Sequence, residues 1–235
     1  MKEEYTKELL DKTKEDYNLI YEEFSRTRWF VWDETKFLFD NYLKEKDKVL
    51  DIGCGNGRYY GVVKYNNADY IGIDNSVKLL EEAKKKYPEA RFELADALSL
   101  PFPDNHFDKV YSIAVFHHIP SKKIRMEFLK EAKRVLKKDG LLILTAWKFY
   151  RPKEYLILFK YTILKLLGKT KLDFKDFFEP WGDETERYYH WFSKRELVKL
   201  LKLSGFKIKD AGIVKNKKGN RRNIYIVAEK KGGLV

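Results

Sequence analysis

Short apolar runs alternate with amphipathic segments along the middle of the chain. The runs have the length and the Val, Ile, Leu, Phe and Tyr content of buried strands. They cover residues 48–51, 69–73, 91–95, 107–114 and 141–146. Between them, apolar positions recur at helical spacing in lysine-rich segments at 76–86 and 122–137. This alternation predicts a parallel, doubly wound α/β sheet.

Different patterns flank this core. Apolar positions predict helices within residues 3–24 and 35–43, and Ser193 is expected to cap a last helix. Strands near 206–213 and 223–229 should then add an antiparallel hairpin to the sheet. One domain is expected, with N-terminal helices at 1–44, a core at 45–147, a basic helical insertion at 148–180 and a substrate-side helix and hairpin at 181–235.

The first strand runs into a glycine-rich loop, with the sequence VLDIGCGNG at residues 49–57. Gly53, Gly55 and Gly57 allow a tight turn and a close approach of the backbone to a ligand. A dinucleotide fingerprint requires G-x-G-x-x-G, whereas here the third glycine comes one position early. The spacing therefore suits a ligand without a pyrophosphate, facing the N-terminus of the next helix.

Acidic residues stand at the ends of the first three strands. Asp74 lies about 20 residues beyond the loop, where such folds keep an acid for ribose hydroxyls. Asp96, followed by Ala97, is placed to recognise an adenine amino group. Any single acid could instead cap a helix. Three of them, with Asp51 as the first, indicate a nucleoside site.

The fourth strand ends in Ser112-Ile113-Ala114-Val115-Phe116-His117-His118. Ligands of open α/β sheets lie beyond the carboxyl ends of the strands. Ser112 and Ile113 are therefore expected in the nucleoside pocket, and the two histidines on the substrate side. One histidine of the pair could instead pack against the following helix.

Residues 45–147 resemble the class I S-adenosylmethionine (SAM)-dependent methyltransferases. The resemblance implies a Rossmann-like, mostly parallel seven-stranded sheet and SAM as the cofactor. It also implies a set of cofactor-binding residues: Asp51, Gly53, Gly55, Gly57, Asp74, Asn75, Asp96, Ala97, Ser112 and Ile113.

Two segments outside the core narrow the resemblance. They are Phe24-Ser25-Arg26-Thr27-Arg28 and Arg187-Tyr188-Tyr189-His190. Together with the histidine segment, they make residues 17 to 229 similar to the Trm9-like tRNA methyltransferases and the methyltransferase domain of their animal AlkB-homologue relatives. The resemblance implies a tRNA substrate, in which the 5-carboxymethyl group of uridine 34 becomes a methyl ester.

The same resemblance implies roles for side chains around the substrate. Arg28 and Arg187 would clamp its carboxylate, because guanidinium binds carboxylate bidentately. His117, Tyr189 and His190 would orient the uracil by hydrogen bonding or stacking. Plain aromatic packing between the N-terminal helix and the sheet is the alternative explanation. A carboxylate is ionised at neutral pH, so no strong base is expected.

A partner protein is a further expectation from the resemblance. Members of this family commonly need a small zinc-containing Trm112-like activator that pairs with a sheet edge. The strand at 69–73 and its neighbouring helix are the expected contact surface. Cys54 is the only cysteine of the chain, so no cysteine zinc cluster and no other metal site are expected in the chain itself.

Charge and composition modify this picture only slightly. The net charge is +12, and the excess collects at residues 148–175 and 215–222. Such patches attract polyanions, although the chain also lacks glutamine and has the Lys and Glu bias of hyperthermophile proteins. No secretory leader is apparent, and the apolar run at 155–163 is too short to span a bilayer. A cytoplasmic protein from a thermophile is therefore expected.

Two other functions remain open at this stage. A small-molecule methyltransferase acting on a quinone, amine or acid would share the glycine loop and acids but would not need Arg28, Arg187 or the basic segments. A non-catalytic RNA-binding module would keep the fold and the basic segments without binding SAM.

Overall fold

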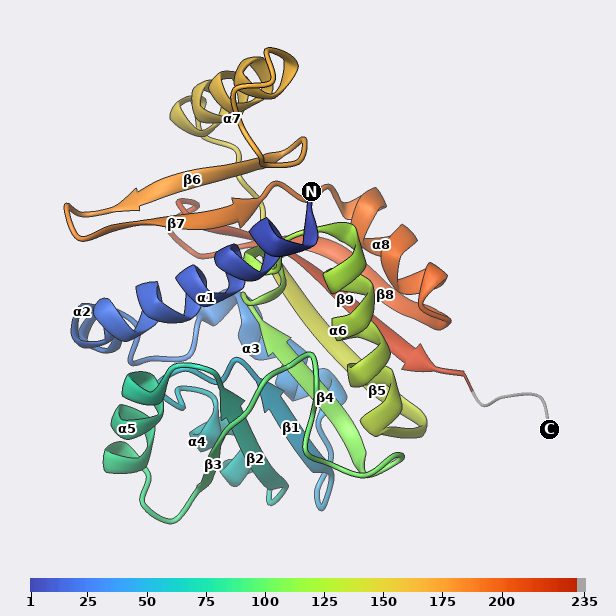
Figure 1. Ribbon diagram of the computed structural model, residues 1–235. Helices are drawn as coiled ribbons and strands as arrows, with labels where there is room; N and C mark the ends of the chain where they lie inside the picture. Colours follow the sequence, from blue (N-terminus) through green and yellow to red (C-terminus); the bar gives the residue numbers. More distant parts are fainter. Residues whose placement is uncertain (232–235) are drawn as a thin grey trace.

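The computed structural model describes residues 1–231 and contains one seven-stranded sheet and one two-stranded sheet (Figure 1). The strand order of the large sheet is β3-β2-β1-β4-β5-β9-β8. Its strands are β1 (Lys48–Ile52), β2 (Asp69–Asp74), β3 (Arg91–Leu94), β4 (Phe107–Ile113), β5 (Leu136–Trp147), β8 (Phe206–Lys215) and β9 (Arg222–Lys230). The first five pair in parallel, and β9 runs antiparallel to both β5 and β8. The predicted mostly parallel sheet with a C-terminal antiparallel hairpin is confirmed.

Helices cover both faces of this sheet, as a doubly wound fold requires. Successive side chains of a strand point to opposite faces, so Leu50 packs into one core and Val49 into the other. The helices are α3 (Asp33–Tyr42), α4 (Tyr60–Tyr65) and α5 (Val77–Lys86) on the Val49 side, and α6 (Lys122–Val135) and α8 (Lys194–Leu203) on the Leu50 side. Both faces are thus buried, which explains why the strands are continuous apolar runs.

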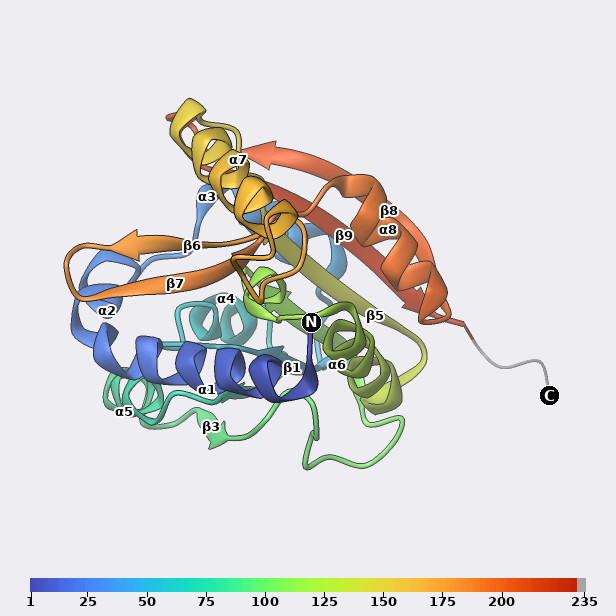
Figure 2. The ribbon, with the colours of Figure 1, turned by 45° about the horizontal axis from the view of Figure 1, so that its top comes forward.

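The N-terminal segment forms two helices where the apolar pattern predicted one. α1 (Glu3–Leu19) and α2 (Tyr21–Thr27) meet at Ile20, whose backbone leaves the helical region. The Ile20 side chain is fully buried in a small cluster with Phe24 and Leu79. α1 contacts α5 and the second sheet, and it lies across the sheet end at which the glycine loop emerges (Figure 2). It can therefore form one wall of a site there.

The insertion contains a helix, as expected, and also a strand pairing that the sequence did not reveal. α7 (Pro152–Leu166) projects from the body, and β6 (Asp176–Trp181) pairs with β7 (Thr185–His190) in an antiparallel hairpin (Figure 1). Much of the apolar surface of α7 and its surroundings is exposed, at Tyr155, Leu156, Phe159, Leu166 and Leu167.

Two predictions are wrong: the residue at which the sixth helix ends, and the position of the strand at 69–73 in the sheet. The sixth helix ends at Val135 instead of residue 137, because Leu136 already pairs with Phe107 in the sheet. The strand at 69–73 is not a sheet edge, because β2 pairs with β1 on one side and β3 on the other. The edges of the large sheet are β3 and β8. Within residues 1–231, no helix combines the length and apolar character needed to cross a bilayer.

Candidate active site

A cavity lies beyond the carboxyl ends of β1 to β4 and is closed on its outer side by α1, α2 and β7. Predicted site residues from both ends of the chain meet in it. Those lining the cavity are Arg28, Gly53, Gly55, Asp74, Asn75, Asp96, Ala97, Ile113 and Arg187. The cofactor side and the substrate side expected from the sequence are therefore parts of one space.

The glycine loop forms the floor of the cavity. Gly53 has φ +74°, and a Cβ added there would lie 2.3 Å from Val115 Cγ2. Gly57 has φ +72° but does not line the cavity; a Cβ there would meet Phe92 Cζ at 2.7 Å. Gly57 thus lets the loop pack against β3, while Gly53 and Gly55 present bare backbone to the cavity.

Asp74 is held by backbone donors at the end of β2. Its Oδ2 accepts a hydrogen bond from the Gly55 N–H (2.8 Å), and its Oδ1 accepts one from the Ser76 N–H (2.9 Å). Burial raises the pKa of Asp74, while these hydrogen bonds favour the carboxylate. Asp96 also combines two roles, because it lines the cavity and its Oδ1 accepts from the Leu98 N–H. Capping and cavity lining are therefore compatible.

Two predicted cofactor residues lie beneath the floor instead of in it. Asp51 is buried and accepts a hydrogen bond from the Tyr70 hydroxyl (2.9 Å). Burial raises the pKa of Asp51 to about 7. Ser112 is fully buried, and its hydroxyl has no partner among residues 1–231. Neither lines the cavity, so their geometry supports the loop above them rather than a direct contact.

Two cations flank one indole ring at the outer wall. The guanidinium carbons of Arg28 and Arg187 lie 4.2 Å and 4.1 Å from the ring centroid of Trp181. Within the described residues neither forms an ion pair: Arg28 donates to the Thr27 hydroxyl and Arg187 donates to the Tyr17 hydroxyl. Burial, and then the charge of Arg187, lower the pKa of Arg28 to about 10. The cavity therefore holds positive charge that no acid neutralises.

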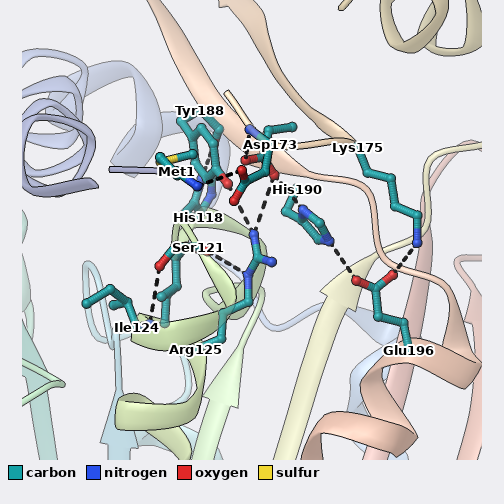
Figure 3. Close-up of polar contacts among 12 residues, drawn as sticks. Met1, His118, Ser121, Ile124, Arg125, Asp173, Lys175, Tyr188, His190 and Glu196 are labelled. Atoms are coloured by element: carbon teal, nitrogen blue, oxygen red, sulfur yellow. Dashed lines mark hydrogen bonds and ion pairs between the residues drawn. The ribbon is translucent and has the colours of Figure 1, made fainter. Parts of the chain in front are cut away.

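A chain of hydrogen bonds links Arg187 to His118. Nη1 of Arg187 donates to the Tyr17 hydroxyl (3.5 Å), which donates to His118 Nε2 (2.8 Å). His118 Nδ1–H donates to the Tyr188 carbonyl oxygen (2.9 Å), which fixes the tautomer (Figure 3). Burial, and then the charge of Arg187, lower the pKa of His118 to about 3. The ring is therefore neutral at physiological pH.

The other predicted histidine and the tyrosine lie behind the cavity wall. His117 and Tyr189 stack at 5.4 Å between ring centroids, and Trp147 stacks on Tyr189 at 5.5 Å. His117 Nδ1 accepts from the Trp147 N–H (3.2 Å), and its Nε2 has no partner among the described residues. Only Trp147 of these three lines the cavity. His117 and Tyr189 thus support the substrate wall without forming its surface.

His190 stands apart from the cavity, which corrects its predicted orienting role. Its Nδ1 is 2.5 Å from Asp176 Oδ1 and its Nε2 is 2.9 Å from Glu196 Oε1 (Figure 3). Arg125 adds an ion pair to Asp176 at 3.5 Å. With both ring nitrogens occupied by carboxylates, His190 ties the second sheet to α8 and has no nitrogen left for a substrate.

Sequence reasoning missed several cavity residues. Arg58 occupies the third glycine slot, is buried, and has its guanidinium carbon 4.2 Å from the Trp32 ring centroid. Its Nη1 has no partner within residues 1–231. A long cation in a position that usually needs a small residue was the available clue. Tyr17, Trp32, Trp147 and Arg58 all line the cavity, and so does His118, which was expected on the substrate side.

Comparisons with known proteins identify the family of this chain. The methyltransferase domain family matches residues 50–144. The tRNA (carboxymethyluridine(34)-5-O)-methyltransferase of Schizosaccharomyces pombe is 30% identical over 238 residues, which cover 91% of this chain and 94% of that protein. The chain belongs to the Trm9-like, class I SAM-dependent methyltransferases.

Solved structures show the same fold for this methyltransferase. A SAM-dependent methyltransferase from Methanosarcina mazei superimposes with a TM-score of 0.69 at 29% identity, covering 83% of this chain and 97% of that one. A chain of the complex between the Haloferax volcanii Trm112 methyltransferase activator and a methyltransferase reaches 0.67 over 95% of this chain and 98% of that one. At 14% identity, this second likeness concerns the fold alone.

SAM is the cofactor of this methyltransferase, and the cavity fits it. Gly53 lines the cavity with backbone, because a Cβ there would collide with Val115 of the same lining, and Asp74 presents an oriented carboxylate. The unpartnered Nη1 of Arg58 adds a donor for an anionic group. These are the features that a zwitterionic nucleoside requires.

Proposed function

We propose that this methyltransferase esterifies the carboxylate of 5-carboxymethyluridine at the wobble position of tRNA. The observation that carries the proposal is the pair of cavity guanidiniums, Arg28 and Arg187, which have no acidic partner. An unpaired buried cation is costly for a protein. An anionic substrate group that completes the pair accounts for that cost, and the name of the S. pombe relative supports a wobble uridine as its carrier.

The cofactor side follows from the floor of the cavity. Asp74, whose two oxygens are aimed by the Gly55 and Ser76 amides, would accept hydrogen bonds from the ribose hydroxyls. Asp96 and Ala97 would contact the adenine, and Gly53 would let the backbone approach the methionine part. When bound, SAM supplies an electrophilic methyl group that a carboxylate oxygen can accept without any proton transfer.

The substrate side positions the acceptor and does not activate it. Arg28 and Arg187 would each bind the carboxylate and hold one of its oxygens toward the methyl group. Both guanidiniums contact the ring of Trp181, which would help to hold them in the wall of the cavity. Trp147, which lines the cavity with an indole N–H that has no partner in the described residues, would contact the uracil.

The protonation states of the histidines favour a carboxylate over a neutral acceptor. A general base works best with a pKa close to the operating pH. The pKa of His118 is lowered to about 3 by burial, and burial also lowers the pKa of His117 well below its usual range. Neither ring would remove a proton from an amine or hydroxyl effectively. A carboxylate, already ionised, needs no such group.

The proposal includes two partners. tRNA would be the substrate, and the cytoplasm, where mature tRNA is abundant, is the expected location. A Trm112-like activator would add to the free edge of β3, where Leu94 and the nearby Val77 are exposed. This edge replaces the inner strand expected from the sequence.

Mass spectrometry of nucleosides tests the proposal directly. tRNA from a strain that lacks the wobble methyl ester is incubated with the protein and SAM, with and without the activator. The expected product is the 5-carboxymethyluridine methyl ester, which mild alkali returns to the acid. An alkali-stable methyl group, or transfer that survives nuclease treatment of the substrate, would contradict the proposal. The second outcome would favour a small-molecule acceptor.

A further inference from the structure

A second cavity of about 570 Å³ opens beside the first. It is lined by the segment that follows β5, by the β6–β7 hairpin and by the turn between β8 and β9. Its volume lies within the range of about 300–1,000 Å³ typical of ligand sites. The two cavities share walls formed by Arg28, Trp32, Trp147 and Arg187. A ligand held in the first can therefore continue into the second.

Cations without acidic partners line this second cavity. Lys148, Arg151 and Arg222 face it, and within residues 1–231 none of them forms an ion pair. Arg221, also in the lining, differs because it is paired with the buried Glu34. The positive charge in excess is thus carried by these three side chains together with Arg28 and Arg187 of the shared walls, and these five cations would otherwise repel one another.

The fold holds these cations in place. The guanidinium carbon of Arg222 lies 3.8 Å from the ring centroid of Tyr150, and Nη2 of Arg151 donates to the Asn220 carbonyl oxygen (2.5 Å). The backbone N–H of Lys148 donates to the Arg222 carbonyl oxygen (2.9 Å), which joins the β5 end to the β8–β9 turn. Such anchoring reduces the entropy lost when an anion binds.

The acids of the cavity are engaged elsewhere. Glu154 accepts hydrogen bonds from the backbone N–H groups of Tyr150 and Arg151, at 2.6 Å and 2.7 Å, and so caps α7. Glu23 accepts from the indole N–H of Trp181 (2.6 Å). Glu179 lies 3.8 Å from Lys153. Within residues 1–231 none of them forms an ion pair with Lys148, Arg151 or Arg222. Burial raises the pKa of Glu179, and the charges of Lys153, Arg187 and Arg151 lower it. One carboxylate is thus shared among several cations, which leaves positive charge for an anion from outside.

We propose that the second cavity binds the phosphodiester groups next to the nucleotide whose base enters the first cavity. This inference rests on the proposed RNA substrate and adds the place where the RNA backbone is held. Phosphate contacts fix the register of a nucleic acid without reading its sequence. Lys148, Arg151 and Arg222 would therefore position the target nucleotide, while the two cavity arginines act on its carboxylate.

A binding experiment with neutralised phosphates tests this site. The probe is a fluorescent anticodon stem-loop RNA with 5-carboxymethyluridine at position 34, made with ordinary linkages or with methylphosphonates on both sides of that residue. Dissociation constants are measured by anisotropy in the presence of S-adenosylhomocysteine. The ordinary RNA should bind roughly ten- to a hundredfold more tightly to the unaltered protein, the usual value of hydrogen bonds to charged groups.

Single substitutions show which side chains produce the difference in affinity between the two RNAs. Arg222→Met changes an exposed residue and so leaves folding intact; it should weaken binding of the ordinary RNA and barely change binding of the neutralised RNA. Lys148→Met should behave in the same way. Lys138→Met is the matched control, because Lys138 is an exposed residue near the start of β5 whereas Lys148 follows its end. This control should retain full discrimination between the two RNAs.

Two outcomes would overturn the proposal. One is an unaltered protein that binds both RNAs equally. The other is a pair of variants that weaken both RNAs to the same extent, since the cations would then act elsewhere. Calorimetry with S-adenosylhomocysteine verifies that each variant is folded. Failure of the proposed reaction would appear instead as a missing methyl ester in the mass spectrum, which this binding assay does not measure.

Discussion

Replacing Arg187 by methionine should abolish most activity and at the same time leave the protein equally stable or more stable. Arg187 is buried with an Nε that has no partner, and it lies beside the second cation Arg28. Methionine keeps an apolar side chain against Trp181 and removes the charge. Loss of function and gain of stability would then come from the same substitution.

The magnitudes follow from the contacts. Two hydrogen bonds from a guanidinium to a carboxylate contribute about 1.5–3 kcal/mol each. Because Arg28 can still bind the carboxylate in the variant, we expect a loss of transition-state stabilisation of roughly 3–4 kcal/mol. This loss corresponds to a factor of about 10² to 10³ in kcat/KM. On the stability side, relief of the unpaired donor is worth about 1–3 kcal/mol, against about 0.5–2 kcal/mol for the lost cation–π contact. The midpoints of these two ranges, about 2 and about 1.25 kcal/mol, leave a net gain of about 0.8 kcal/mol, which corresponds to a rise in Tm of about 2–3 °C for a chain of this size.

Three measurements decide the matter. Initial rates on tRNA give kcat/KM, calorimetry gives the affinity for S-adenosylhomocysteine, and a thermal melt gives Tm. The affinity for S-adenosylhomocysteine should stay within about threefold, because the cofactor floor is built from β1 and β2 residues. Arg195→Met, an exposed arginine on α8, serves as the control and should change nothing. A drop in Tm of several degrees, or an equal loss of cofactor affinity, would refute the clamp and make Arg187 a structural residue.

Three further predictions come from the same geometry. Between about pH 6 and 9, kcat/KM should be flat, because His118 protonates only near its pKa of about 3, Arg28 loses its proton only near about 10, and the substrate carboxylate is ionised above about 4. Asp51, whose pKa is about 7, does not line the cavity, so an inflection near neutrality that persists in Asp51→Asn would reveal a general base. The pKa of Asp51 rises from 3.8 to about 7 on folding, so this acid lowers stability progressively as pH increases from about 4 to 7. The free energy of unfolding of Asp51→Asn should therefore exceed that of the unaltered protein by an amount that grows over this window to at most about 4 kcal/mol. Denaturant titrations that give a constant difference between the two proteins would disprove this prediction. Gly53→Ala places a Cβ 2.3 Å from Val115 on a backbone with φ +74°; urea unfolding should show a loss of about 2–4 kcal/mol, and a loss below 1 kcal/mol would mean that the loop can rearrange.

The sheet was predictable because its strands are buried on both faces. Continuous apolar runs such as residues 69–73 cannot be confused with a half-exposed strand, and the acid that follows marks the carboxyl end. The same logic predicts from the sequence that Asp74 and the glycine loop lie together. Interior and edge strands look alike in such runs, so the sequence did not show that β2 is an inner strand.

The second sheet could not be predicted in the same way. Phe177 and Tyr189 pair across β6 and β7 and are fully buried, but their burial comes from packing with Phe149 and Trp191, outside the hairpin. Long-range aromatic packing leaves no local periodicity. His190 misled for the same reason: its sequence neighbours pointed to the substrate, whereas its partners Asp176 and Glu196 lie on other elements.

The structure also shows which site residues line the cavity and which lie behind its wall, a distinction that the spacing of residues in the sequence could not reveal. In the pair of adjacent histidines, His118 faces the cavity and His117 lies behind it. Both residues lie in a short 3-10 turn at Phe116–His118 and their ring centroids are 4.3 Å apart, yet only the His118 side chain reaches the cavity. Arg58 was seen only as a departure from a glycine pattern, because its meaning comes from Trp32, which reaches it from α3's N-cap position.

The contact of Trp181 with two guanidiniums has an optical consequence. An indole within 4.1 Å and 4.2 Å of two positive charges emits in a strong local electric field. An arriving anion would cancel part of that field, so the emission wavelength of this ring would shift when the acceptor enters. The chain has five tryptophans, and Trp32 lies 4.2 Å from Arg58 on the cofactor side. The part of a stopped-flow fluorescence trace that disappears in Trp181→Phe would therefore report the arrival of the acceptor.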